Sequence, residues 1–251
     1  MERTEREKQI EYETYLAKRR ALKRKKRQRK AAFQILMSLI IIIIIGIIGW
    51  QSVKFIKGRN GKPVSVKSEL PKKIVKTPPD YDIQYLTVNP YSRPGIPLEK
   101  VNGVVVHYTA NPSTTAQQNR DYFEGLSLSG ETSVSSHFVI GIEGEVILCI
   151  PCDEIAYASN ERNADTISIE CCIPDESGKF ADATYDTLIH LLAWLAGKYD
   201  LETDDIIRHY DVTGKNCPKY YVEYESAWDA LKMDVRNYIE HNGAIEETTE
   251  E

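Results

Sequence analysis

The chain has 251 residues, of which 27% are charged and 42% hydrophobic, and this composition excludes a wholly disordered or fibrous protein. Residues 1–30 hold 13 Lys and Arg against 5 Asp and Glu, although the whole chain has a net charge of -5. The rest is therefore acidic and repels phosphate, so we expect no nucleic-acid partner along it. Five cysteines are too few, and odd in number, for a disulfide scaffold.

The first 50 residues predict a membrane anchor. A basic cluster at 18–30 precedes an uncharged run at 31–50, and these 20 residues suffice for a bilayer core of roughly 30 Å. The run is longer than the apolar part of a cleaved signal peptide, and no A-x-A-like cleavage site follows it. We therefore expect an uncleaved, single-pass signal anchor in the cell membrane. The positive-inside rule places residues 1–30 in the cytoplasm and everything after residue 51 outside.

Residues 51–80 predict an extended linker. They contain eight Lys and Arg and four prolines, and they show neither a helical nor a strand period. We expect this linker to hold a domain at 81–243 away from the membrane, with an acidic tail at 244–251. The basic segment 1–30 is interpreted as a topology signal, and recruitment of a cytoplasmic partner is the alternative.

Strand and helix patterns alternate through residues 81–243, which predicts an α/β fold with a mixed central β-sheet flanked by helices. Glu143-Gly144 lies between two apolar runs and indicates a hairpin. The expected strands cover 101–107, 137–142, 145–150, 166–172 and 206–209. The expected helices cover 114–125, capped by Ser113, then 182–199 and 224–240.

Two histidines and a cysteine predict a zinc site. His107 ends a fully apolar strand, His209 ends a second short strand, and Cys217 follows eight residues later. Functional groups collect at such strand ends in α/β sheets. Two imidazoles and a thiolate suit Zn²⁺, and three protein ligands leave a fourth position open, as in catalytic sites. A structural zinc site is disfavoured because no fourth ligand lies at the usual spacing, and a core histidine is the alternative for His107.

Glu170 interrupts a β-branched strand, where burying a carboxylate is costly. Side chains alternate along a strand, so Ser168 and Glu170 share one face while Ile167 and Ile169 share the other. The residues alone leave two interpretations of Glu170 open. It lies either in a cleft with a chemical role or on an edge strand in solvent.

The other four cysteines form the pairs Cys149-x-x-Cys152 and Cys171-Cys172. Neighbouring residues of a strand point to opposite faces, which disfavours a four-cysteine metal site. Buried free thiols, or one disulfide involving Cys149 or Cys152, remain as the two expectations.

An ordered set of motifs resembles the zinc-dependent N-acetylmuramoyl-L-alanine amidase family, which includes phage amidase lysozymes and peptidoglycan recognition proteins. The resemblance spans roughly residues 95–240. The motifs are Val106-His107-Tyr108-Thr109-Ala110, Ser136-His137-Phe138-Val139-Ile140, Glu143-Gly144, Ser168-Ile169-Glu170 and His209-x7-Cys217-Pro218, with Lys215 inside the last. The resemblance implies a mixed sheet with flanking helices, and one zinc ion held by His107, His209 and Cys217.

The resemblance also implies a general base at Glu170 and a charge-stabilising lysine at Lys215. Tyr108, His137 and Tyr157 are expected only as substrate contacts.

The sequence departs from the family pattern at two places. Some members place a catalytic tyrosine where this chain has Ser136, which makes Glu170 more important to the mechanism. Many members carry Trp-His-Ala where this chain has Tyr157-Ala158-Ser159, so any contact made by that histidine is absent here.

The implied function is that of a membrane-anchored zinc hydrolase. It would cleave the amide bond between N-acetylmuramic acid and L-alanine in peptidoglycan, with its catalytic domain on the wall side. The expected partners are the peptidoglycan glycopeptide and, through residues 31–50, the membrane. The alternative is a recognition module that binds peptidoglycan without cutting it. Such relatives typically lack the ligand cysteine, so Cys217 together with Glu170 and Lys215 favours an enzyme.

Overall fold

The computed structural model of the chain describes residues 72–245. The expected cytoplasmic segment 1–30, the anchor 31–50, linker residues 51–71 and tail residues 246–251 lie outside the described residues. Within 72–245, no helix has both the length and the apolar character needed to cross a bilayer. The anchor and its topology stay predictions from the sequence.

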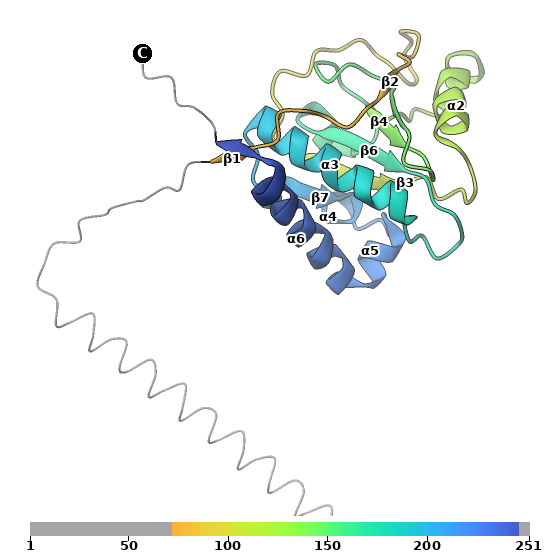
Figure 1. The fold of residues 1–251 in the computed structure, drawn as a ribbon. Helices are drawn as coiled ribbons and strands as arrows, with labels where there is room; N and C mark the ends of the chain where they lie inside the picture. The colour runs from red at the N-terminus through yellow and green to blue at the C-terminus, as the bar shows by residue number, and fades with distance from the viewer. Residues whose placement is uncertain (1–71, 246–251) are drawn as a thin grey trace, which may run out of the picture. The chain divides into compact units, whose positions relative to one another are not determined.

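The main sheet has six strands in the order β2-β5-β4-β6-β3-β7 (Figure 1). Only the β4–β5 pair is antiparallel among the pairs of this sheet, so the expected mixed sheet is confirmed. That pair is the hairpin around Glu143-Gly144, and Gly144 adopts a φ of 85° in its turn. The strands are β2 (Asp82–Ile83), β3 (Val104–Tyr108), β4 (Phe138–Ile140), β5 (Val146–Leu148), β6 (Ile167–Cys171) and β7 (Ile206–Arg208).

Helices cover both faces of this sheet. Helices α3 (Asp182–Tyr199) and α6 (Glu225–Asn242) lie on one face, where they bury the larger apolar core against Val104 and Val106 of β3 (Figure 1). Helix α2 (Ala116–Ser129) packs on the other face, where Phe123 contributes to a smaller core. Because side chains alternate along β3, His107 faces the α2 side. Strands β3 and β6 pair with His107 opposite Glu170, so both belong to this face.

The long helices agree closely with the sequence pattern, but the start of α2 does not. Helix α3 has the predicted bounds, and α6 differs by one residue at its start and two at its end. Helix α2 begins two residues later than expected, with Thr115 rather than Ser113 as its cap. The Gln118 N–H donates to Thr115 Oγ1 at 3.1 Å, and the Thr115 N–H donates to Gln118 Oε1 at 2.9 Å. Ser113 instead adopts a φ of 63° and donates its hydroxyl to the Pro174 carbonyl.

A second, two-stranded sheet joins the two ends of the described region. Strand β1 (Lys73–Ile74) pairs antiparallel with β8 (Ala244–Ile245), as Figure 1 shows. Val75, directly after β1, is buried in the larger core. The folded domain therefore includes residues that the sequence pattern assigned to the linker and to the tail.

All five cysteines are free. Cys171 lies in the larger core and Cys172 in the smaller one, as strand alternation predicts for neighbours. Burial raises the pKa of the Cys149 and Cys172 thiols to about 12, so both are protonated near neutral pH. Of the two expectations for these cysteines, the structure bears out free thiols.

Candidate active site

The structure brings His107, His209 and Cys217 together. Their ligand atoms lie within 4.8 Å of one another, and all three residues are buried. Cys217 Sγ lies 3.8 Å from His107 Nδ1, and the two imidazole centroids are 4.7 Å apart. His107 therefore meets two residues that lie more than a hundred positions later in the chain, and the three form one cluster of metal-binding atoms.

Parallel pairing of β3 and β7 explains this convergence. Val106 is the register partner of Arg208, so the residues that follow them, His107 and His209, lie at the same edge of the sheet. His209 begins the short helix α4 (His209–Thr213). The Tyr210 N–H then donates to the Cys217 carbonyl at 2.9 Å, which closes the loop that carries the third member of the cluster.

Arg208 fixes the position of α4. Its side chain is nearly buried and contacts Asp211 of α4 and Glu225 of α6 at 2.8 and 2.7 Å. It also donates to the carbonyl of Tyr221, in helix α5 (Lys219–Glu223), at 2.8 Å. One guanidinium group thus joins three helices directly beside His209.

The cluster fits a zinc ion. Zn–N and Zn–S bonds of about 2.0 and 2.3 Å in a tetrahedral site put two such ligand atoms roughly 3.6 Å apart. His209 Nδ1 is buried and has no hydrogen-bond partner among residues 72–245, so a donor atom is free for a metal. Burial lowers the pKa of both His107 and His209, which favours the neutral imidazole that metal binding needs.

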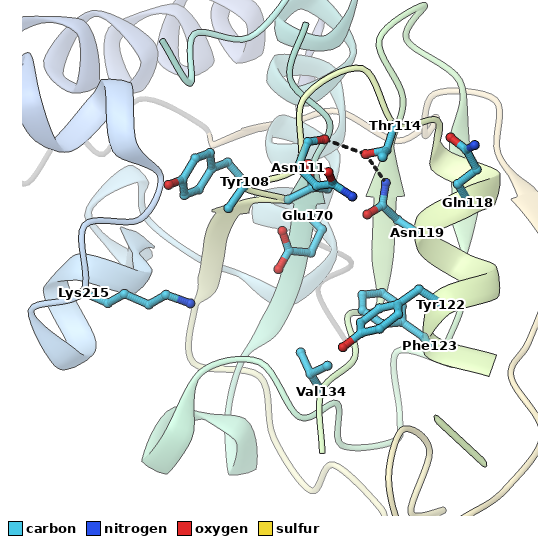
Figure 2. Close-up of a pocket in the computed structure, with 12 residues that line it drawn as sticks. Tyr108, Asn111, Thr114, Gln118, Asn119, Tyr122, Phe123, Val134, Glu170 and Lys215 are labelled. Atoms are coloured by element: carbon cyan, nitrogen blue, oxygen red, sulfur yellow. Dashed lines mark hydrogen bonds between the residues drawn. The ribbon is translucent and has the colours of Figure 1, made fainter. Parts of the chain in front are cut away.

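Glu170 and Lys215 face one pocket of about 530 Å³ beside this cluster (Figure 2). Figure 2 shows the carboxyl group of Glu170 in the pocket and the amine of Lys215 directed toward it. Burial raises the pKa of Glu170 to about 7, against the lowering effect of Lys215. Glu170 Oε2 is buried with no hydrogen-bond partner in the described part of the chain. The expectation of a cleft carboxyl group therefore agrees with the structure, and that of a solvated edge residue does not.

The three expected substrate contacts have different surroundings. Tyr108 lines the pocket. His137 does not, because it is fully buried and both ring nitrogens are hydrogen-bonded. Its Nδ1 accepts from the Ser168 N–H at 3.0 Å and its Nε2 donates to the Glu154 carbonyl at 2.9 Å. Tyr157 is half-buried and lies outside the residues that line the pocket. Both ring nitrogens of His137 therefore support the surrounding backbone, and its contact with substrate stays a prediction from the resemblance.

The sequence pattern missed the opposite wall of the pocket. This wall comes from α2 and the loop before it, and its side chains are mostly neutral and polar (Figure 2). The polar residues on the exposed turns of α2 were the available signal, but they look like an ordinary solvated helix face. The wall residues are Asn111, Thr114, Gln118, Asn119, Tyr122 and Phe123.

Comparisons with known proteins agree with this fold and site. Residues 97–220 match the family described as N-acetylmuramoyl-L-alanine amidase. The amidase CwlL of Bacillus licheniformis is 34% identical over 179 residues, covering 66% of this chain and 49% of the relative. The amidase BlyA of Bacillus subtilis (strain 168) is 33% identical over 173 residues, covering 61% and 46%. The chain thus spans about half the length of the curated relatives it matches.

A solved structure shares the fold. The structure of PlyL covers 62% of this chain and 97% of its own, with 21% identity and a TM-score of 0.54. The described domain is an α/β domain with a mixed sheet and a buried His-His-Cys cluster at the edge of that sheet. The domain belongs to the N-acetylmuramoyl-L-alanine amidase family, as the motifs indicated.

Proposed function

We propose that this protein is a zinc-dependent amidase that cleaves the bond between N-acetylmuramic acid and L-alanine in peptidoglycan. The observation that carries the proposal is the arrangement of one pocket. A buried carboxyl group and a lysine line the pocket, and both lie close enough to the cluster suited to zinc to act electrostatically on its members. Family membership supports the same reaction.

His107, His209 and Cys217 would hold the zinc ion. When bound, zinc supplies a lowered pKa for water and polarisation of the substrate carbonyl. Glu170 accepts a proton from the attacking water and returns it to the departing amine. A group with a pKa of about 7 suits this double role, because it takes up and releases protons easily near neutral pH.

Lys215 stabilises the negative charge that develops on the carbonyl oxygen. Its side chain is exposed and makes no ion pair within residues 72–245, so its charge remains available to substrate. Loss of one such stabilising group typically costs about 10²–10³ in rate. The adjacent neutral wall of α2 offers amide and hydroxyl groups, which suit a glycopeptide.

Mass spectrometry of digested murein tests the reaction. The full chain with zinc is expected to release peptides with free L-alanine amino termini and to leave the glycan strands uncut. Metal analysis of the same sample is expected to give one zinc per chain. Products of a glycosidase or an endopeptidase would contradict the proposal. Binding to murein without release of peptide would support the recognition module instead.

We further propose that residues 31–50 anchor the protein in the cell membrane and that the domain faces the wall. The support is the uncharged run behind a basic cluster, since these residues lie outside the part that the structure describes. Protease treatment of intact protoplasts is expected to remove the domain while a tag at the N-terminus stays protected. Extraction of the full chain from membranes by alkaline carbonate would contradict the anchor.

A further inference from the structure

The two ring nitrogens of His107 face different neighbours. Nδ1 lies 3.8 Å from Cys217 Sγ, inside the metal-binding cluster. Nε2 lies 3.1 Å from the hydroxyl oxygen of Ser159, a residue that is 1% exposed. In the sequence, Ser159 belongs to Tyr157-Ala158-Ser159, where the chain departs from the family pattern, and no role was expected for it. It stands 52 positions from its partner.

We infer that Ser159 is a positioning residue for the metal site. This inference rests on the proposed zinc site. A neutral imidazole carries one N–H and one lone pair, so the group that accepts the N–H decides which nitrogen can bind a metal. Ser159 Oγ accepts the proton of His107 Nε2. Nδ1 is left with its lone pair directed into the cluster, and the hydrogen bond fixes the rotation of the ring.

The backbone around Ser159 is held in place for this role. Asn163 Oδ1 accepts from the N–H of Ala158 at 3.0 Å and from that of Ser159 at 2.6 Å. Asn163 lies in the 3-10 helix η1 (Asn160–Ala164), which begins directly after Ser159. The hydroxyl group is therefore presented from a short segment whose backbone N–H groups are already bonded.

His137 provides a comparison within the same domain. It too is a buried histidine, but the sheet backbone and a loop carbonyl satisfy both of its nitrogens. His107 has an oxygen partner only at Nε2, and its Nδ1 faces the Cys217 sulfur at 3.8 Å inside the cluster. The same residue type is thus structural at one position and directed toward a metal at the other.

Nitrogen NMR of the unaltered, metal-free full chain tests the tautomer directly. The expected result is a His107 ring protonated at Nε2. The His137 ring, which the backbone holds in the same form, serves as the internal reference. A His107 ring protonated at Nδ1 would overturn the inference.

Zinc affinity, measured by competition with a chelator, tests the consequence. Ser159→Ala is expected to weaken zinc binding about 10–100-fold, the usual effect of losing a group that orients a ligand histidine. Ser92→Ala is the matched control. Ser92 is also fully buried, and its hydroxyl accepts from Asn89 Nδ2 at 2.9 Å outside the cluster. The control is expected to bind zinc like the unaltered chain.

The outcomes separate this inference from the proposed function. Equal zinc affinity with and without the Ser159 hydroxyl overturns the inference alone. A chain that binds no zinc overturns the proposed function and the inference with it. If Ser159→Ala does not fold, the tautomer of His107 in the unaltered chain still decides.

Discussion

Glu170 is buried, which disfavours a charged carboxylate, yet the proposed mechanism needs that carboxylate as a base. Its carboxyl group is separate from the three ligand residues, so Glu170→Gln is expected to leave zinc content unchanged. Turnover is expected to fall about 10²–10⁴-fold, because a glutamine side chain cannot exchange a proton with water. Murein digestion and metal analysis on one preparation measure both. A Gln variant with the original rate would remove Glu170 from the mechanism.

The same carboxyl group makes the stability of the metal-free protein depend on pH. Burial raises its pKa from 4.5 to about 7, so the folded state favours the protonated form. The contribution of Glu170 to the stability of the folded state is therefore fully present below about pH 4.5 and is lost as pH rises through 7. A change of this size corresponds to roughly 3 kcal/mol.

Glu170→Gln carries no such titration. With zinc removed, urea unfolding is expected to show that the variant's free energy of unfolding, relative to that of the unaltered chain, rises by about 1–3 kcal/mol from pH 5 to pH 8. Histidines titrate equally in both proteins and cancel in this difference. A difference that stays constant between the two pH values would show that Glu170 is not desolvated in the folded state.

Individual residues show why only part of the site could be read from the sequence. The three ligand residues were predictable because His107 lies near the end of a strand, His209 directly follows another, and Cys217 comes eight residues after His209. The burial of His137 was not predictable because a motif does not say which ring nitrogens the sheet already uses. Ser159 was recognisable only as part of a departure from the family pattern, since the role inferred for it depends on a contact across 52 positions.

At the scale of elements, the N-terminal cap of α2 fixes the start of the helix that forms one wall of the pocket. Thr115→Ala removes the hydroxyl that accepts from the Gln118 N–H and is expected to cost about 1 kcal/mol in the free energy of unfolding. Ser113→Ala is the control, expected to cost about 0.5 kcal/mol because it loses only an exposed hydrogen bond to the Pro174 carbonyl outside the cap. Urea unfolding measures both. A larger loss for Ser113→Ala would restore the start of the helix predicted from the sequence.

Element length explains which parts of the fold were predictable. Helix α3 has 18 residues and four leucines on a buried face, so its period is clear in the sequence. Helices α4 and α5 have five residues each, too few to show a period. Strands β1 and β8 have two residues each, and their pairing joins chain segments that nothing local connects.

At the scale of the whole domain, the proposed zinc ion would join β3 to the segment 209–217, about a hundred positions later in the chain. The cluster takes one residue from β3, one from α4 and one from the loop before α5. A ligand that binds only the folded state stabilises it, by about 2.7 kcal/mol when its free concentration is 100 times the dissociation constant. Chelation of zinc is therefore expected to lower the melting temperature of the domain as a whole.

Cys217→Ser separates this effect from other actions of the chelator. The variant lacks the thiolate ligand, so its melting temperature is expected to lie near that of the metal-free chain and to be unaffected by the chelator. Calorimetry of both proteins with and without chelator measures the difference. If the unaltered chain and the variant lost the same number of degrees on chelation, the metal would act elsewhere than at the cluster of His107, His209 and Cys217.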